Sequence, residues 1–323
     1  MLGSLRRRGI LGINRRNANY TLRCNPRRFY PLVDDKLATK RLCDEAGIPV
    51  PKLIAVAHHH FEVKRLPAAV RSEGAFVLKP ARGAMGNGIV VLRRDASGQL
   101  LRGGRRYSDD QFVYHAAGII SGLYSLAGHS DQAIVEECLE THPALARISV
   151  DGVPDVRVVV YRGIPVMAMT RLPTVRSGGR ANLHQGAVGA GIDLATGRTH
   201  HAVLRNRPVQ HHPDNGEPLL GCEIPNFPRA LEIAVSATDP TGLGYVGADV
   251  VVDARRGPVI LELNARPGLA IQIANRAGLR SRLEAVDARL EGAGEGAERA
   301  LPVHERVEVG KEVAAAAREE DGR

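Results

Sequence analysis

Acidic side chains interrupt two apolar runs in the C-terminal third of the sequence. Asp249 lies in the run 247–253 and Glu262 in the run 259–263, with Asn264 two residues later. Because side chains at i and i+2 of a strand share a face, Glu262 and Asn264 would point the same way, and a hairpin between the two runs would bring Asp249 beside them. A carboxylate buried in an apolar strand needs a partner. A hard cation such as Mg²⁺, which prefers oxygen ligands, is one such partner. An arginine, with Asn264 capping a turn, is the alternative.

A glycine-rich loop between two other apolar runs indicates a second kind of chemistry. The runs 75–80 and 88–92 predict strands, and the glycines in and beside the intervening loop 81–87 would let the backbone approach a ligand closely. Lys79 adds a positive charge at the end of the first strand. The loop is not a Walker P-loop, since its lysine precedes the glycines and no helix follows, and it lacks the strand–glycines–helix order of the dinucleotide fingerprint. It therefore indicates a flap over phosphate groups; an ordinary glycine-rich hairpin is the alternative.

The elements that would hold these residues are short strands and helices. We expect helices over 34–47, 109–126 and 226–238, where apolar residues recur at helical spacing beside capping residues. Further strands are expected over 133–139, 155–161 and 164–169, the last two forming a hairpin. The pattern is that of an α/β (α+β) protein.

Length and composition bound the class of protein. At 323 residues, with 44% apolar side chains, the chain can form two domains or one large one. It has no run of 18 apolar residues and no secretory h-region, and its four scattered cysteines fit neither a zinc site nor a disulfide framework. A reducing cytoplasm is the expected compartment. The net charge of +9 favours anionic ligands, but no motif or aromatic platform for nucleic acid accompanies it.

Three segments are expected to lie outside the packed domains. Residues 1–33 are predicted to be a basic, solvated arm, and residues 192–225 an irregular insertion without a core of its own. Residues 281–323 are predicted to be a charged C-terminal tail, which from Glu291 onward is a mobile or loosely attached helix. We interpret the histidines of the insertion and the run His58–His60 as surface residues rather than metal ligands.

Taken in order, these pieces resemble the ATP-grasp enzymes, in particular the α-L-glutamate ligase-like group related to the ribosomal-protein glutamate ligases. The similarity covers roughly residues 34–275. The matching motifs are Asp35-Lys36 with 47–51, Phe76–Pro80 with the glycine loop, Ile134–Cys138, Asp155-Val-Arg157, Arg180–Gly186, and Asp249 with Glu262–Gly268. The last two are the most specific.

The resemblance implies a role for each matching residue. ATP would be bound by Lys36, Lys79, Gly83, Gly86, Asn87, Gly88, Glu136, Glu137, Cys138 and Leu139. Mg²⁺ or Mn²⁺ would be bound by Asp249, Glu262 and Asn264. Arg157 and Arg180 would stabilise charge during catalysis, and Asn182, His184 and Arg266 would contact substrate.

The resemblance also implies a fold and a reaction. The fold is the ATP-grasp fold, with lobes at 34–138 and 139–280 that each carry an antiparallel sheet and helices and hold ATP between them. The reaction joins a carboxylate to an amine, such as glutamate to an acidic or peptide acceptor, through an acylphosphate. A kinase acting on a hydroxyl and a non-catalytic nucleotide-binding protein are the alternatives. Only about 35 residues precede Lys36, where the family usually has a domain. The acceptor site is therefore expected to be open, or completed by a second copy or a partner protein.

Overall fold

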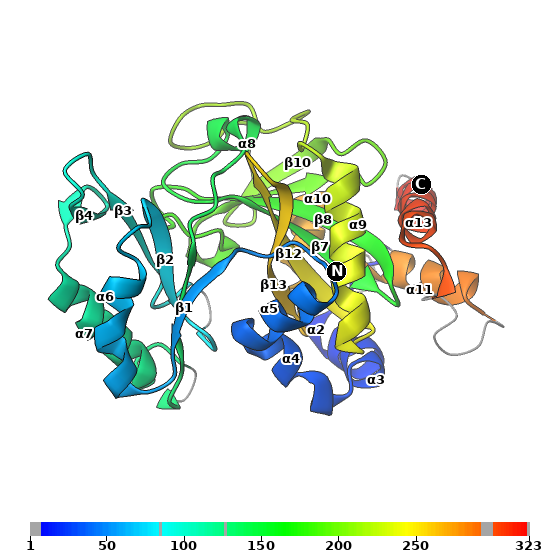
Figure 1. Ribbon diagram of the computed structural model, residues 1–323. Coiled ribbons are helices and arrows are strands. Elements are labelled where there is room, and N and C mark those ends of the chain that lie inside the picture. Colours follow the sequence, from blue (N-terminus) through cyan, green and yellow to red (C-terminus); the bar gives the residue numbers. More distant parts are fainter. Residues whose placement is uncertain (1–7, 84–85, 126–127, 292–299, 322–323) are drawn as a thin grey trace. The chain divides into compact units, whose positions relative to one another are not determined.

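The computed structural model describes residues 8–83, 86–125, 128–291 and 300–321 (Figure 1). The chain divides into two compact units, each with one antiparallel sheet. Unit 1 comprises residues 1–34, 41–50 and 140–323, and unit 2 comprises residues 35–40 and 51–139. Within the described ranges, no helix combines the length and apolar character needed to cross a membrane.

Unit 2 is built on a six-stranded sheet with the order β1-β6-β2-β3-β4-β5. The strands are β1 (Leu53–Ala57), β2 (Ala75–Pro80), β3 (Val90–Arg94), β4 (Leu100–Arg102), β5 (Arg105–Arg106) and β6 (Ala133–Glu137). Helices α6 (Leu66–Ala69) and α7 (Asp109–Ile120), with the 3₁₀ turn η3 (His60–Arg65), pack on one face of this sheet (Figure 1). Phe76 on β2 meets Phe112 on α7 there, edge to face. The predicted strands of unit 2 are thereby confirmed to within two residues at their ends.

Unit 1 is built on a seven-stranded sheet with the order β11-β10-β9-β8-β7-β12-β13. The strands are β7 (Asp155–Tyr161), β8 (Ile164–Leu172), β9 (Val188–Ile192), β10 (Thr199–Leu204), β11 (Arg207–Pro208), β12 (Tyr245–Asp253) and β13 (Gly257–Asn264). The helical segments are α2 (Ile13–Arg15), η1 (Arg16–Thr21), α3 (Leu22–Cys24), η2 (Arg27–Phe29), α4 (Pro31–Asp34), α8 (Pro143–Arg147), η5 (Leu183–Gln185), α9 (Phe227–Thr238), η6 (Asp239–Thr241), α10 (Ala270–Asn275), α11 (Arg280–Arg289) and α13 (Val303–Asp321). The two hairpins predicted from sequence, β7–β8 and β12–β13, are confirmed.

The two faces of the unit 1 sheet bury different layers. Side chains such as Val156 and Val158 lie in one core cluster with helix α9, which runs along β12 and β13 (Figure 1). Their neighbours Val159 and Tyr161 point to the opposite face, because side chains alternate along a strand. There they pack with α10, α11 and the N-terminal segment.

The predicted helices are confirmed in position but differ at their ends. The first is α5 (Lys36–Glu45). Asp35 caps it by accepting hydrogen bonds from the backbone N–H groups of Leu37 and Ala38, at 2.9 and 3.2 Å. The second, α7, ends at Ile120 rather than 126. Its next turn contains Gly122 at a φ of 81°, which a continuing helix does not permit.

The N-terminal segment is not a solvated arm, and this expectation was wrong for residues 9–33. Leu11 and Tyr20 are buried in the second core cluster, and the ring of Tyr20 meets that of Tyr161 edge to face at 5.4 Å. Asn25 is 1% exposed and is hydrogen-bonded to the backbone where β12 begins and where β13 ends. Residues 1–7, which include the first arginines, lie outside the described residues.

The segment 192–225 and the C-terminal segment are also packed, contrary to the predictions. The former supplies β10 and β11 to the sheet and buries Leu219 and Ile224 in the main core. The latter supplies α11 and α13. Arg306 of α13 is 2% exposed and forms a double hydrogen bond with Asp239, at 2.7 and 2.6 Å. These contacts could not be predicted from local composition, because their partners lie far away in the sequence.

Candidate active site

The register of the β12–β13 hairpin places Asp249 opposite Glu262. Asp249 pairs with Glu262 and the next residue, Val250, pairs with Ile260, so Leu261 has no partner on β12. This one-residue bulge reverses the alternation of side chains along β13. An uninterrupted ladder would put Leu261 opposite Asp249 and turn Glu262 toward the core. The bulge therefore creates the acidic pair that the sequence pattern predicts.

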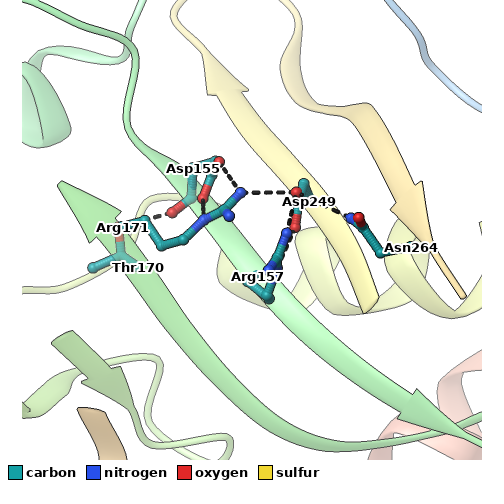
Figure 2. Close-up of polar contacts among 6 residues, drawn as sticks. All are labelled: Asp155, Arg157, Thr170, Arg171, Asp249 and Asn264. Atoms are coloured by element: carbon teal, nitrogen blue, oxygen red, sulfur yellow. Dashed lines mark hydrogen bonds and ion pairs between the residues drawn. The ribbon is translucent and has the colours of Figure 1, made fainter. Parts of the chain in front are cut away.

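Asp249 is held by arginines from two other strands (Figure 2). Arg157 on β7 donates from Nε to Oδ1 at 2.7 Å and from Nη2 to Oδ2 at 2.6 Å. Arg171 on β8 donates from Nη2 to the same Oδ2 at 2.8 Å. Asn264 Nδ2 approaches this oxygen at 3.4 Å. Asp249 is 2% exposed, so these contacts replace nearly all of its hydration.

Arg171 lies between two carboxylates and links them (Figure 2). Its Nε and Nη2 donate to the two carboxylate oxygens of Asp155 at 2.6 and 2.5 Å, while Nη2 also reaches Asp249. The hydroxyl of Thr170, which is fully buried, donates to the backbone oxygen of Asp155 at 3.0 Å. The result is a chain of ionised groups running across β8, β7 and β12.

The pKa values of Asp155 and Asp249 are shifted in opposite directions. Burial opposes ionisation of Asp249, but Arg157 and Arg171 outweigh it and hold the pKa of Asp249 below its usual value. Burial raises the pKa of Asp155 to about 6; the nearby Asp249 carboxylate also raises it, and Arg171 lowers it. Both aspartates are therefore charged above that pH, and they balance the two guanidinium groups.

The donor set on β12 and β13 suits a hard divalent cation. Asp249 and Glu262 supply carboxylate oxygens from adjacent strands, and Asn264 supplies an amide oxygen two residues beyond Glu262. Mg²⁺ favours such oxygen ligands. Glu262 and Asn264 are partly exposed, so this edge of the cluster is accessible. The alternative weighed from sequence paired an arginine with Glu262, whereas in the structure the arginines bind Asp249. A cation at Asp249 would replace part of that pairing.

The loop after β8 carries three more predicted site residues. Its ends are tied by Thr174, which exchanges hydrogen bonds with Ser177 and donates to the Gly186 backbone oxygen at 2.9 Å. Asn182 accepts from the backbone N–H of His184 at 3.0 Å and so caps the short turn η5. The side chains of Arg180 and His184 are exposed on this anchored loop.

Arg266, the remaining predicted substrate residue, follows β13. Its guanidinium lies over the ring of Tyr30, 5.2 Å from the centroid. It is exposed, and the aromatic face gives it a fixed neighbour from the N-terminal segment.

In unit 2, Lys79 and Glu136 form a buried ion pair. Glu136 on β6 contacts Lys79 with one carboxylate oxygen and lies 3.1 Å from the Lys40 ammonium with the other. All three side chains are at most 6% exposed. Burial opposes ionisation of Glu136, yet the two lysines hold its pKa below the usual value. Lys40 also donates to the backbone oxygen of Pro51.

Lys36 and the glycine loop lie together in the same unit. Lys36 Nζ donates to the backbone oxygen of Gly83 at 2.6 Å. Gly86 and Gly88 have φ values of 74° and 76°, which favour glycine. A Cβ on Gly88 would lie 2.6 Å from the ring of Tyr124, so this position has no room for a side chain. Asn87 is exposed between them, and residues 84 and 85 lie outside the described residues.

The segment after β6 carries the predicted adenine-binding residues. Glu137 is tied to β1 through its backbone N–H, which donates to Lys52 O at 3.0 Å, and its carboxylate accepts from Lys52 N at 2.7 Å. Cys138 is partly exposed, and Leu139 is 8% exposed. The apolar side chain of Leu139 therefore lies two residues beyond the end of β6.

The sequence reasoning missed two charged residues that pair with buried carboxylates of the predicted site. Arg171 contacts Asp249, and Lys40 contacts Glu136. Arg171 had a usable signal, since it is a charge inside an apolar strand, as Glu262 is. Lys40 had a weaker one, one helical turn after Lys36.

The fold and these residues define the class of protein. The sequence matches the sugar-transfer associated ATP-grasp family over residues 15–288, and the chain belongs to that family. The resemblance noted from the motifs is thereby confirmed at the level of the superfamily, and the two units with antiparallel sheets agree with an ATP-grasp fold.

Particular relatives are more distant. The chain is 25% identical over 236 residues to a probable alpha-L-glutamate ligase of Enterobacter sp. (strain 638), covering 73% of this chain and 56% of that protein. It therefore spans little more than half the length of this relative. Among solved structures, it is similar to the D-cycloserine synthetase DcsG (TM-score 0.46, 15% identity, 82% of this chain and 73% of that chain). It is also similar to the ATP-grasp ligase PsnB complexed with a precursor variant, Mg and ADP (TM-score 0.45, 18% identity, 83% and 62%).

Proposed function

We propose that the chain is an ATP-dependent carboxylate–amine ligase that releases ADP and phosphate. The observation that carries the proposal is the row of Asp249, Glu262 and Arg157, which places two carboxyl groups and a guanidinium on one sheet face. Transfer of a phosphoryl group needs positioning and charge stabilisation more than a covalent nucleophile. Family membership supports this choice of chemistry.

The ligands that we propose divide between the two units. In unit 2, Lys36, Lys79 and the loop residues Gly83, Gly86, Asn87 and Gly88 bind the phosphates of ATP, and the segment Glu136–Leu139 binds adenine. In unit 1, Asp249, Glu262 and Asn264 hold Mg²⁺ or Mn²⁺, which supplies neutralising charge at the phosphates when bound. The relative described as a probable glutamate ligase makes glutamate the first substrate to test.

The reaction proceeds in two balanced steps. A substrate carboxylate attacks the γ-phosphorus, forming an acylphosphate and releasing ADP; an amine then attacks the acyl carbon, losing a proton and displacing phosphate. Arg157 and Arg180 stabilise the charge that spreads over the transferring oxygens and the tetrahedral intermediate. Asn182, His184 and Arg266 position the acceptor.

The test is a screen of purified protein with Mg-ATP against pairs of acids and amines, following phosphate release and product mass. Glutamate and acidic peptides are included, as are sugar acids and amino sugars, because the family is described as sugar-transfer associated. Hydroxylamine should trap the acylphosphate as a hydroxamate in step with ADP formation. A phosphoester that hydroxylamine leaves intact would instead identify a kinase, and the absence of any turnover would favour a nucleotide-binding protein without catalysis.

Variants link this activity to the site. Asp249→Asn and Glu262→Gln should each abolish turnover. The exposed Glu223, which pairs with Arg198 on the surface, provides the control Glu223→Gln, which should retain full activity. Normal turnover in both site variants would remove these carboxylates from the proposed mechanism.

A further inference from the structure

The two arginines that hold Asp249 are anchored differently. Within the described residues, every hydrogen bond of the Arg157 guanidinium goes to Asp249. Arg171 instead makes two bonds to Asp155 and a third to Asp249. If the bonds to Asp249 were removed, Arg157 would lose its hydrogen-bonded partner, whereas Arg171 would stay in place on Asp155.

The oxygens of Asp249 are also used unequally. Oδ2 accepts from both guanidinium groups and faces Asn264, whereas Oδ1 accepts from Arg157 alone among the described residues. Releasing Arg157 would therefore expose one whole oxygen and part of the other. Arg171 would still hold Oδ2 and so fix the orientation of the carboxylate.

We propose that Arg171 is a positioning residue that orients Asp249 for the cation, and that Arg157 is the partner that the cation displaces. This inference rests on the proposed function, because it takes Asp249 as a metal ligand. It divides two chemically identical side chains into a permanent support and an exchangeable one. Arg157, once displaced, is available to the transferring phosphoryl group.

The Arg171–Asp155 pair is itself held in the sheet. The hydroxyl of Thr170, the neighbour of Arg171 on β8, donates to the backbone oxygen of Asp155 at 3.0 Å. Arg171 and Asp155 are directly opposite each other in the β7–β8 ladder, as Arg157 and Asp249 are in the β7–β12 ladder, and both pairs are at most 12% exposed. The two arginines therefore differ not in burial or register but in their partner, because the residue opposite Arg171 is not the proposed metal ligand.

Lysine variants separate these roles because they keep the charge and lose the planar fork. Mn²⁺ binding is measured by electron paramagnetic resonance at saturating ADP, with Asp249→Asn defining loss of the site. Arg171→Lys should raise the dissociation constant for Mn²⁺ by roughly 10–100-fold, the usual effect of removing a residue that orients a metal ligand. Arg157→Lys should leave it unchanged or lower it, since the displaced partner becomes easier to displace.

Kinetics give an independent readout. In Arg171→Lys, the Mg²⁺ concentration for half-maximal turnover should rise, while kcat at saturating Mg²⁺ largely recovers. In Arg157→Lys, kcat itself should fall and the Mg²⁺ requirement should stay. Arg306→Lys is the matched control, because the buried Arg306 also forms a double hydrogen bond with an aspartate in unit 1. It should lower stability without changing Mn²⁺ affinity.

A double-mutant cycle tests the connection through Asp155. If Asp155 acts by holding Arg171, Asp155→Asn combined with Arg171→Lys should weaken Mn²⁺ binding no more than the stronger single change. Wild-type Mn²⁺ affinity in Arg171→Lys, or equal weakening in both lysine variants, would overturn the division of roles while the proposed function stood. Mn²⁺ binding unaffected by Asp249→Asn would overturn the metal assignment itself and this inference with it.

Discussion

At the scale of single residues, ionised groups are buried in both units, and each is stabilised by a partner from another strand or helix. Asp249 has Arg157 and Arg171, and Glu136 has Lys79 and Lys40. Removing one member of such a group leaves an uncompensated buried charge, which costs more than the pair contributes. Functional variants at these positions will therefore also lose stability, and activity must be interpreted together with unfolding.

Glu136→Gln should lower the free energy of unfolding by about 3–5 kcal/mol at neutral pH, because two buried ammonium groups lose their counter-ion. The pH dependence has a definite sign. The folded pKa of Glu136 is lowered from 4.5, so its stabilising effect is present above that pH and is lost as the pH falls below it. Urea unfolding followed by circular dichroism from pH 3 to 7 should therefore show a shallower acid limb in the variant. The partly exposed Glu73 supplies the control Glu73→Gln, and identical acid limbs in wild type and Glu136→Gln would contradict the assignment.

Lys36→Ala and Lys79→Ala should each weaken ATP binding by about 10–100-fold, the loss expected for one charge-assisted contact to phosphate. They should differ in stability. Lys36 donates to the backbone oxygen of Gly83, whereas Lys79 neutralises the buried Glu136. Lys36→Ala should thus unfold near the wild-type urea midpoint, and Lys79→Ala well below it. Calorimetric ATP affinities equal to wild type in both variants would rule out the two-lysine assignment.

At the scale of elements, the two hairpins determine which side chains meet. Each has a turn that the sequence marks with glycine, and each could be predicted. Neither register could be predicted. Tyr161 pairs with Ile164, but Val159 pairs with Met167, so a bulge shifts the β7–β8 ladder by one residue. Without it, Thr170 rather than Arg171 would lie opposite Asp155. The sequence prediction also ended this strand at 169, which left Arg171 outside it.

The acidic pair was predictable for a different reason. The hypothesis that Asp249 and Glu262 converge came from charges in apolar runs and from the family motif, neither of which depends on counting along the ladder. The packed N-terminal segment could not be predicted, because Tyr20 and Asn25 carry no local pattern and their partners begin more than 100 residues later. Long-range pairing of this kind leaves no trace in sequence periodicity.

Deleting Leu261 should leave the cation site in place, because Leu261 is the residue of β13 without a partner on β12. Without it, Val250 still pairs with Ile260 and Asp249 with Glu262, and Leu263 keeps its place in the core, where it is 1% exposed. We therefore expect Mn²⁺ binding close to that of the wild type, measured by electron paramagnetic resonance. Leu261→Ala keeps the residue count and is the control for loss of the side chain. Loss of Mn²⁺ binding in the deletion variant alone would show that the site needs the local twist of the bulge and not only the pairing of Asp249 with Glu262.

At the scale of the whole molecule, unit 1 is assembled from three separate stretches of chain. Asn25 illustrates how they are joined: its amide donates to the backbone oxygens of Tyr245 and Ala265 at 2.7 and 2.8 Å and accepts from two backbone N–H groups, those of Gly244 and Tyr245, at 3.1 and 2.9 Å. These bonds hold the beginning of β12 beside the end of β13, the two strands that carry Asp249 and Glu262.

Asn25→Ala should lower the free energy of unfolding by about 2–6 kcal/mol, because four hydrogen bonds at about 0.5–1.5 kcal/mol each are lost from a buried position. Hydrogen exchange should increase first at the start of β12. Asn19 is exposed in the same segment, so Asn19→Ala is the control and should change little. Unchanged stability of the Asn25 variant would mean that water replaces the amide without loss.

The discontinuity of unit 1 has a consequence for the nascent chain. All residues of unit 2 have been synthesised once Leu139 has been added, whereas Tyr20 must wait for Tyr161 and Tyr245 before it can be buried. At about 5–20 residues per second, the interval between Tyr20 and Tyr245 is roughly 10–45 s. During that time the ribosome carries a chain whose inserted unit can already fold while its own N-terminal apolar segment still lacks a partner. The segment around Tyr20 is thus among the last parts of unit 1 to become native.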